Sequence, residues 1–161
     1  MSKISPFLWF DTQAEDAARF YVSLFPNSRI VSVNGLPVDL PHTGAKAGEV
    51  ITVAFELDGQ PYVAMNGGPG HPFTDAISLV IDCDGQDEVD RYWNALVADG
   101  GKEVACGWLK DKYGLSWQVT PRQLMEMTTS PDKAAAARAF QAMMGMVKID
   151  IAALKAAFEG K

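Results

Sequence analysis

The chain has 161 residues with a net charge of −6, and 48% of its residues are hydrophobic. This length fits one domain or a closely paired duplication with a substantial core, and the acidic balance argues against nucleic acid or an anionic membrane surface as a partner. There is no apolar stretch near the roughly 20 residues of a membrane span, no signal-peptide pattern at the start, and too few cysteines for a disulfide scaffold, so we expect a cytoplasmic protein with reduced thiols.

The first half of the chain predicts a strand, a helix and three further strands. An apolar strand at residues 7–10 precedes an amphipathic helix at residues 12–25, where Thr12 and Glu15 fit a capping box. Glycine and proline between residues 34 and 48 predict a long loop of the kind that is often mobile or covers a site. The remaining strands of this half are expected at residues 29–33, 49–57 and 62–65, with Asp58-Gly59 as a hairpin turn between the last two.

The same order returns about 72 residues later, after a glycine- and proline-rich linker at residues 66–72. Asp11 and Gln13 at the start of the first helix match Asp84 and Gln86 at the start of the second. A repeat of this length indicates one supersecondary unit used twice. The second copy predicts a strand at residues 77–81, a helix at 86–98, and strands at 104–109 and 116–120.

The end of the sequence predicts a helical tail. Ser130-Pro131-Asp132 is a typical helix start, and the alanine-rich segment that follows is expected to bury Ala136, Phe140, Met143 and Met144. Asp150 can cap a last helix of about ten residues, which is too short to be stable alone. We therefore expect this helix to dock, either on its own chain or on a second subunit.

Several motifs spread over nearly the whole chain carry a resemblance to a known family. They lie at Pro6–Asp11, Phe20-Tyr21, Phe55–Gln60, Asn66–Pro69, Cys106–Asp111, Tyr113–Gln118 and Lys148–Leu154. On these motifs the chain resembles the PhnB-like group labelled "3-demethylubiquinone-9 3-methyltransferase" in the vicinal oxygen chelate (glyoxalase/bleomycin-resistance/dioxygenase) superfamily.

The resemblance implies an α+β fold of paired βαβββ modules with a C-terminal helical tail, and a homodimer. We expect a single domain over residues 1–161, with module one at about 4–66, module two at about 73–121 and the tail at about 130–160. A strand-helix unit repeated around a curved sheet leaves a concave inner face.

Metal-dependent members of the superfamily hold a divalent ion with His, Glu or Gln on that face. The matching positions here fall near Ser5, Ile77, Asn66 and Gln118, and of these only Gln118 is a usual ligand type. The two histidines, His42 and His71, lie in loops and are better interpreted as exposed loop residues than as ligands. We therefore expect neither a metal nor a cofactor.

Two further kinds of chemistry are weakly indicated. The glycine-rich residues 66–72 could suggest a nucleotide-type cofactor site, but two prolines remove backbone donors and no helix follows, so a linker is favoured. Cys106 is a candidate reactive thiol with Lys110 and Lys112 near in sequence. A small, partly buried thiol is the favoured interpretation, since no histidine is close enough to act as a base.

Aromatic and amide side chains on the first and late strands predict a small-molecule site. The candidate ligand-binding residues are Phe7, Trp9, Asn66, Trp108 and Gln118. Trp117 and Gln118 are adjacent on a strand and face opposite ways, and Gln118 is favoured for the site. The alternative is that the tryptophans are simply core residues.

The leading hypothesis is a protein that binds a small organic molecule in the concave face without a metal. The alternative is an enzyme, either a methyltransferase as the family label says or a metal-dependent isomerase, lyase or dioxygenase. A third hypothesis is a dimer whose cleft is vestigial or serves an interaction.

Overall fold

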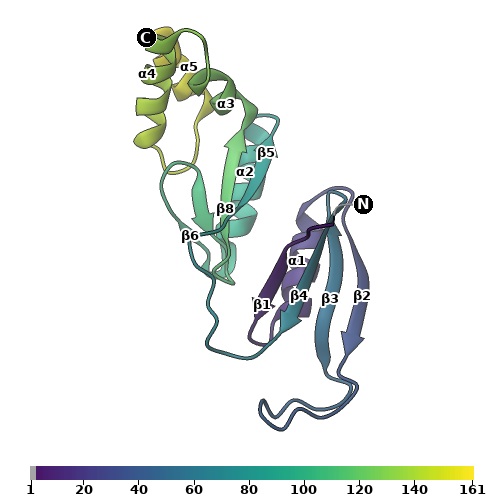
Figure 1. Ribbon diagram of the computed structural model, residues 1–161. Coiled ribbons are helices and arrows are strands. Elements are labelled where there is room, and N and C mark those ends of the chain that lie inside the picture. The colour runs from purple at the N-terminus through teal and green to yellow at the C-terminus, as the bar shows by residue number, and fades with distance from the viewer. Residues whose placement is uncertain (1–2) are drawn as a thin grey trace. The chain divides into compact units, whose positions relative to one another are not determined.

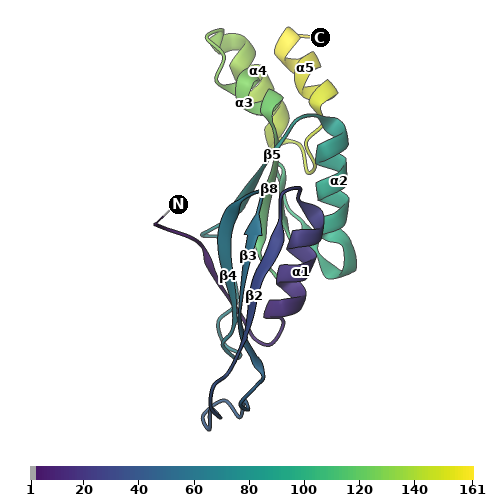
Figure 2. The same cartoon turned by 90° about the vertical axis from the view of Figure 1, so that its right-hand side faces the viewer.

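The computed structural model describes residues 3–161 and divides into two compact units, Met1–Pro72 and Phe73–Lys161, called module one and module two below. Each contains one four-stranded sheet with a helix against one face, and the second also carries three C-terminal helices (Figures 1 and 2). The expected α+β fold of paired βαβββ modules with a helical tail is confirmed.

Module one has the order strand, helix and three strands. The elements are β1 (Phe7–Phe10), α1 (Ala14–Leu24), β2 (Arg29–Gly35), β3 (Val50–Leu57) and β4 (Gln60–Asn66). The strand order in the sheet is β1-β4-β3-β2, in which β1 runs parallel to β4 and the other neighbours are antiparallel. The carboxyl ends of β1 and β4 therefore lie side by side.

The core of module one lies between the sheet and α1. Leu8 and Phe10 on β1 alternate with Phe7 and Trp9, and only the first pair is buried. On β3, Val53, Phe55 and Leu57 are buried. Small residues on α1 let the helix approach the sheet closely, and Ala14, Ala17, Ala18 and Tyr21 have no exposed surface. Phe7 and Trp9 thus lie on the sheet face away from α1.

The predicted capping box at the start of α1 is wrong. The N-cap residue is Gln13, and its side chain makes no capping hydrogen bond. The cap comes instead from a residue 52 positions away, because the backbone N–H of Ala14 donates to Oδ1 of Asn66 at 2.8 Å. Local sequence spacing cannot reveal a cap that the end of β4 supplies.

Module two repeats the arrangement. Its elements are β5 (Leu79–Cys83), α2 (Gln86–Val97), a 3₁₀ turn (Ala98–Gly100), β6 (Lys102–Glu103), β7 (Trp108–Lys110) and β8 (Ser116–Pro121). The strand order is β5-β8-β7-β6, with β5 parallel to β8. The helix α2 buries Val89, Tyr92, Trp93 and Leu96, as its spacing predicts.

The predicted strand at residues 104–109 is wrong, because the chain reverses inside it. Cys106 and Gly107 have φ angles of 59° and 81°, and the N–H of Trp108 donates to the carbonyl of Ala105. This turn separates β6 from β7. Its N–H groups pair with the C-terminal segment, since Cys106 donates to Met146 and Gly107 to Val147, both at 2.8 Å. The alternation of apolar residues along the sequence cannot reveal this chain reversal, because a distant segment stabilises it.

A buried carboxylate fixes the turn between β7 and β8. Asp111 is 2% exposed, and its Oδ1 accepts hydrogen bonds from the backbone N–H groups of Tyr113 and Leu115. Its Oδ2 accepts from the indole Nε1 of Trp117 at 2.8 Å. Trp117 is therefore a core residue of module two, and Gln118 lies on the opposite face of β8.

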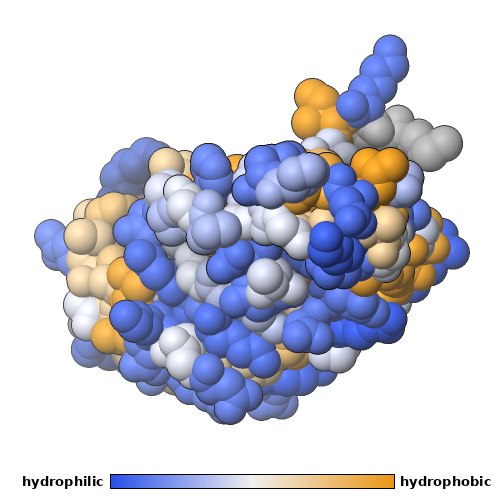
Figure 3. All heavy atoms as spheres, turned by 90° about the horizontal axis from the view of Figure 1, so that it is seen from below, coloured by the Kyte–Doolittle hydropathy of each residue, from blue (hydrophilic) through white to orange (hydrophobic). Residues whose placement is uncertain are grey.

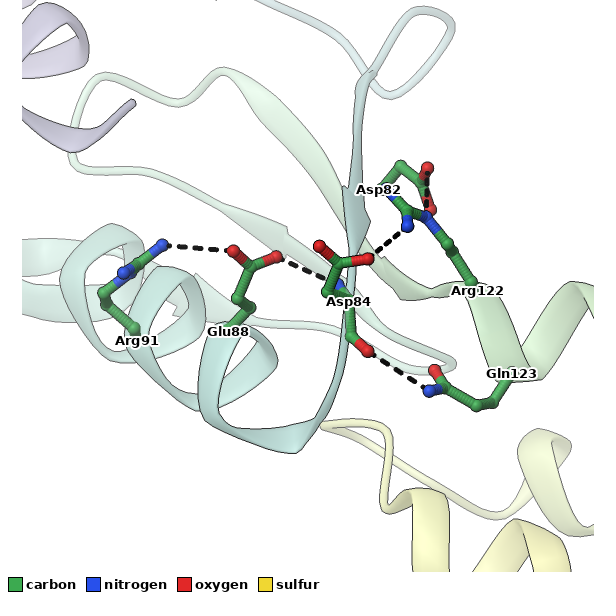
Figure 4. Close-up of polar contacts among 6 residues, drawn as sticks. All are labelled: Asp82, Asp84, Glu88, Arg91, Arg122 and Gln123. Atoms are coloured by element: carbon green, nitrogen blue, oxygen red, sulfur yellow. Dashed lines mark hydrogen bonds and ion pairs between the residues drawn. The ribbon is translucent and has the colours of Figure 1, made fainter. Parts of the chain in front are cut away.

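The tail consists of α3 (Arg122–Thr128), α4 (Lys133–Met144) and α5 (Ile151–Glu159). The sequence did not predict α3. Figure 4 shows how it is attached: Arg122 lies between Asp82 and Asp84 at the end of β5, and Nε2 of Gln123 donates to the carbonyl of Asp84. These contacts fix the start of α3 directly against the sheet.

The last helix docks on its own chain. A buried cluster forms from Leu124 of α3, Ile149 just before α5, and Leu154 of α5. Asp150 caps α5 as expected, and Gln86 at the start of α2 accepts a hydrogen bond from the N–H of Ile151 at 2.9 Å. Of the two docking partners left open by the sequence, the structure gives contacts with the same chain.

Two of the residues predicted to be buried in α4 are not. Phe140 and Met144 are 51% and 58% exposed, whereas the small residues Ala135, Ala136 and Ala139 are buried. The apolar residues of α4 lie on two sides of the helix, and α3 and α5 cover only one of these sides.

The face of the molecule seen in Figure 3 is mostly hydrophilic, with apolar side chains in separate patches. None of the helices within residues 3–161 has the length and apolar character to cross a membrane.

Candidate functional site

Module one contains a hollow of about 810 Å³ at the carboxyl ends of β1 and β4. Residues 36–49, called the arm below, return to these strand ends and form the opposite wall. The apolar lining comes from Trp9, Leu36, Leu40, Val50, Ile51 and Met65, and the polar lining includes Asp11, Thr12, His42, Thr43, Glu49 and Asn66. Its size is in the range of sites for small organic molecules.

The arm is anchored at its base and folded on itself. The N–H of Leu36 donates to the carbonyl of Glu49 at 2.8 Å, and Leu36 is buried. Farther out, the carboxylate of Asp39 accepts a hydrogen bond from the N–H of Ala47 and pairs with Lys46 at 3.1 Å. These contacts, the backbone hydrogen bond first, lower the pKa of Asp39 below its usual value. The arm therefore has a fixed conformation, and it contributes both apolar and polar side chains to the hollow.

Trp9 is the largest side chain of the hollow. Its indole Nε1 donates to the carbonyl of Gly68 at 2.9 Å, and its ring lies 4.4 Å from that of His71 between centroids. A side chain at position 67 would overlap the six-membered ring of Trp9, so only glycine fits there. The half-buried indole is thus fixed in position while part of it lines the hollow.

Asn66 serves the architecture of the hollow directly. Besides capping α1, it donates from Nδ2 to the carbonyl of Val50 at 3.1 Å. The single amide therefore ties the end of β4 to the start of α1 and to the start of β3. Both oxygen and nitrogen are engaged with backbone, so Asn66 shapes the wall that it lines.

Two backbone donors of the glycine-rich segment after β4 are bonded within the chain. The N–H groups of Gly67 and Gly68 donate to the carbonyls of Phe10 and Asp11 at 2.9 and 3.2 Å. They continue the pairing of β1 with β4. A loop that binds phosphate presents such donors to its ligand, and these two are already bonded within the chain.

The other predicted site residues lie elsewhere in their modules. Phe7 is on the same sheet face as Trp9 but is 58% exposed and does not line the hollow. In module two, Trp108 and Gln118 are opposite each other in the β7–β8 register, on the face away from α2. Nε2 of Gln118 donates to Oγ of Ser78 at 2.9 Å. The structure thus places Trp9 with Asn66, and Trp108 with Gln118.

The candidate thiol Cys106 occupies the turn between β6 and β7. Its backbone N–H donates to the carbonyl of Met146 at 2.8 Å, and the residue is half-buried. The two lysines near it in sequence have other partners: Lys110 pairs with Asp75 at 2.8 Å, and Lys112 lies over the ring of Tyr113. Cys83 is a buried core residue, and burial raises the pKa of its thiol to about 12.

The arm supplies lining residues that the sequence did not predict for the site. Leu36, Leu40, His42 and Glu49 all lie in or beside the predicted loop. His42 is exposed, as expected, yet it borders the hollow. The sequence signal for these lining residues is the pair of leucines in an otherwise glycine- and proline-rich stretch. Such leucines indicate that a loop packs against other parts of the protein.

Comparison with known proteins identifies the family. Residues 2–120 match the family model described as 3-demethylubiquinone-9 3-methyltransferase. The chain belongs to this family. The resemblance to its PhnB-like members, expected from the motifs, is confirmed. No curated protein matches the chain significantly.

Solved structures agree with the 3-demethylubiquinone-9 3-methyltransferase family assignment. A putative 3-demethylubiquinone-9 3-methyltransferase, the PhnB protein of Bacillus cereus, is 37% identical, with a TM-score of 0.66 over 74% of this chain and 99% of that one. Protein PA1353 of Pseudomonas aeruginosa is 18% identical, with a TM-score of 0.56 over 75% of this chain and 98% of its own, and shares the fold.

The metal-ligand pattern that the resemblance suggested does not fit this member of the 3-demethylubiquinone-9 3-methyltransferase family. Ile77 has no donor atom, the amide of Asn66 is bonded to backbone on both sides, and the amide of Gln118 is bonded to Ser78. Over residues 3–161, no three His, Cys, Asp or Glu side chains form a group that could hold a metal ion.

Proposed function

We propose that this PhnB-like protein binds a small organic molecule in the hollow of module one, without a metal ion. The observation that carries the proposal is the indole of Trp9, held by Gly68 and His71, opposite the apolar side chains of the arm. A fixed aromatic ring and aliphatic side chains suit an organic molecule with a flat apolar part.

The location refines the expectation from the sequence. The hollow lies where β1 and β4 end beneath the arm, and it includes Trp9 and Asn66 from the predicted set. Phe7 belongs to the adjoining sheet face, and Trp108 and Gln118 belong to module two. The test therefore compares tryptophans of the two modules.

The experiment is a titration with a panel of flat aromatic compounds, followed by calorimetry, on matched variants. Trp9→Ala is expected to weaken binding about tenfold or more, because an aromatic contact and its buried area are lost. Trp108→Ala removes the same side chain from a half-buried position outside the hollow and is expected to change affinity less than about twofold. Equal effects of the two changes would contradict the proposed location.

A second variant in the wall of the hollow keeps the test valid if Trp9→Ala fails to fold. Leu40→Ala shortens a half-buried side chain of the arm that lines the hollow and forms no part of the β1–β4 packing. It should lower affinity about threefold to tenfold while the circular dichroism spectrum is retained. Unchanged affinity in this variant would place the ligand elsewhere.

Methyl transfer, the activity in the family's name, is the alternative to binding alone. Gly67 and Gly68 use their N–H groups within the chain, so these two donors are not offered to a cofactor. A thermal-shift titration with S-adenosylmethionine separates the two functions. A saturable rise in melting temperature, followed by methylation of an added acceptor, would favour the enzyme over the binding protein.

We also propose that the protein is a homodimer, as the resemblance implies. The support is the uncovered apolar surface of the tail, where Phe140 and Met144 lie one turn apart on α4 and are more than half exposed. Sedimentation at micromolar concentration should give twice the 17.4 kDa chain mass, and Phe140→Ser should shift it toward the single chain. A wild-type protein that sediments only as the single chain would refute the dimer.

A further inference from the structure

The charged groups around the hollow are all of one sign. Its lining includes the carboxylates of Asp11 and Glu49, and none of the lining residues is lysine or arginine. Both acidic residues are exposed, and neither pairs with a basic side chain within residues 3–161. No ion pair within the described residues therefore neutralises the two carboxylates.

The remaining charges of module one do not compensate them. Three of its four lysine and arginine residues already pair with other carboxylates: Arg19 with Glu15, Arg29 with Glu56, and Lys46 with Asp39. Lys46 is the informative case, because it lies in the arm next to Ala45 of the lining, yet its Nζ is 3.1 Å from Asp39. The one lysine of the arm thus forms its ion pair with a residue outside the lining.

An aromatic ring accompanies the two carboxylates. The π-face of an indole attracts a cation, and the attraction grows when the site is partly shielded from water. Trp9 is half-buried and fixed by its bond to Gly68, so it does not have to reorganise to meet a ligand. The hollow therefore combines carboxylates, an indole and aliphatic walls. These groups are complementary to a molecule that is apolar at one end and positively charged at the other.

We propose that the ligand of the hollow is an amphipathic organic cation, such as an aromatic or aliphatic amine or a quaternary ammonium compound. This rests on the proposed function, since it names the class of molecule for the same site. An anion of equal shape is disfavoured, because it would approach two uncompensated carboxylates in a chain whose net charge is −6.

The test uses three probes with the same ring and different charge: 2-naphthylmethyl-trimethylammonium, 2-naphthalenemethanol and 2-naphthoate. Calorimetric titration at low salt should show the cation binding about tenfold more tightly than the alcohol, and the carboxylate binding most weakly. The preference should shrink when the ionic strength is raised, because exposed charges are screened.

The matched variants are Asp11→Asn with Glu49→Gln, and Asp58→Asn as the control. The control removes the same kind of charge from the β3–β4 turn, at the other end of the sheet, and asparagine tolerates the positive φ of 47° there. The double change should reduce the preference for the cation to within about threefold, and the control should leave it near tenfold.

The outcomes separate the two proposals. If the alcohol and the carboxylate bind as tightly as the cation, the hollow is a binding site and the cation inference fails. A preference that survives Asp11→Asn with Glu49→Gln also overturns it. If none of the three probes binds up to about 10 mM, a level that corresponds to very weak affinity, the proposed function itself fails.

Discussion

The six-membered ring of Trp9 occupies the space in which a side chain at position 67 would begin. Gly67 does not have a positive φ, so its lack of a side chain serves the close approach and no unusual backbone conformation. The next residue, Gly68, accepts the indole hydrogen bond at 2.9 Å. Two adjacent glycines therefore hold the main wall of the proposed site.

This relationship predicts a steric penalty for Gly67→Ala. The methyl group would overlap the Trp9 ring, so we expect a loss of about 1–3 kcal/mol in the free energy of unfolding. Urea denaturation measures it, with Gly145→Ala as the control, because a methyl group there meets only an ordinary contact. In a Trp9→Ala background the cost of Gly67→Ala should fall, and an unchanged cost would show that the ring is not responsible.

Two substitutions of Asn66 are expected to lower the free energy of unfolding by different amounts. Asn66→Ala removes both the cap of α1 and the bond to Val50, and should cost about 2 kcal/mol of unfolding free energy. Asn66→Asp keeps an acceptor for Ala14 and loses the donor, so it should fall between wild type and the alanine variant. Asn34→Ala, on the exposed strand β2, is the control and should cost less than about 0.5 kcal/mol. An equal cost at both positions would refute the long-range cap.

The sequence predicted the modules well because their signals are local. Apolar alternation in β1 and β3 and helical spacing in α1 and α2 come from residues a few positions apart, and burial agrees with them. The failures involve distant partners. The cap from Asn66 to Ala14 spans 52 residues, and the turn at Cys106 and Gly107 pairs with Met146 and Val147. The hollow likewise depends on where the arm returns, which spacing does not encode.

The side chain of Gln86 holds the start of α5 on module two. Its side chain accepts from the N–H of Ile151, donates to the carbonyl of Ile149 at 3.1 Å and contacts Asp90. Gln86→Ala leaves these backbone groups without the amide, so hydrogen exchange in residues 151–159 should accelerate about tenfold. Gln141→Ala, on the exposed side of α4, should leave the exchange unchanged. Equal exchange in both variants would mean that the buried cluster alone holds α5.

Cys83 predicts a pH dependence with a definite sign. Burial, aided by Glu88, raises the pKa of this thiol from its usual 9.0 to about 12. A raised thiol pKa means that the unfolded chain loses its proton first, so the contribution to stability is full below pH 9.0 and is lost as the pH rises toward about 12. Denaturation of Cys83→Ala should show a weaker decline over this interval than Cys106→Ala, and identical profiles would assign the decline to other groups.

The most direct test of the proposed site is the indole N–H spectrum of the ¹⁵N-labelled protein during titration with the naphthyl cation and, separately, with its neutral alcohol. Trp93 and Trp117 donate their indole N–H groups to Glu103 and Asp111 inside module two, so they act as internal references. We predict that the Trp9 signal, assigned by its absence in Trp9→Phe, moves saturably with at least one probe while both references stay in place. A Trp9 signal that does not move, or that moves only together with the references, would contradict a binding site in the hollow of module one.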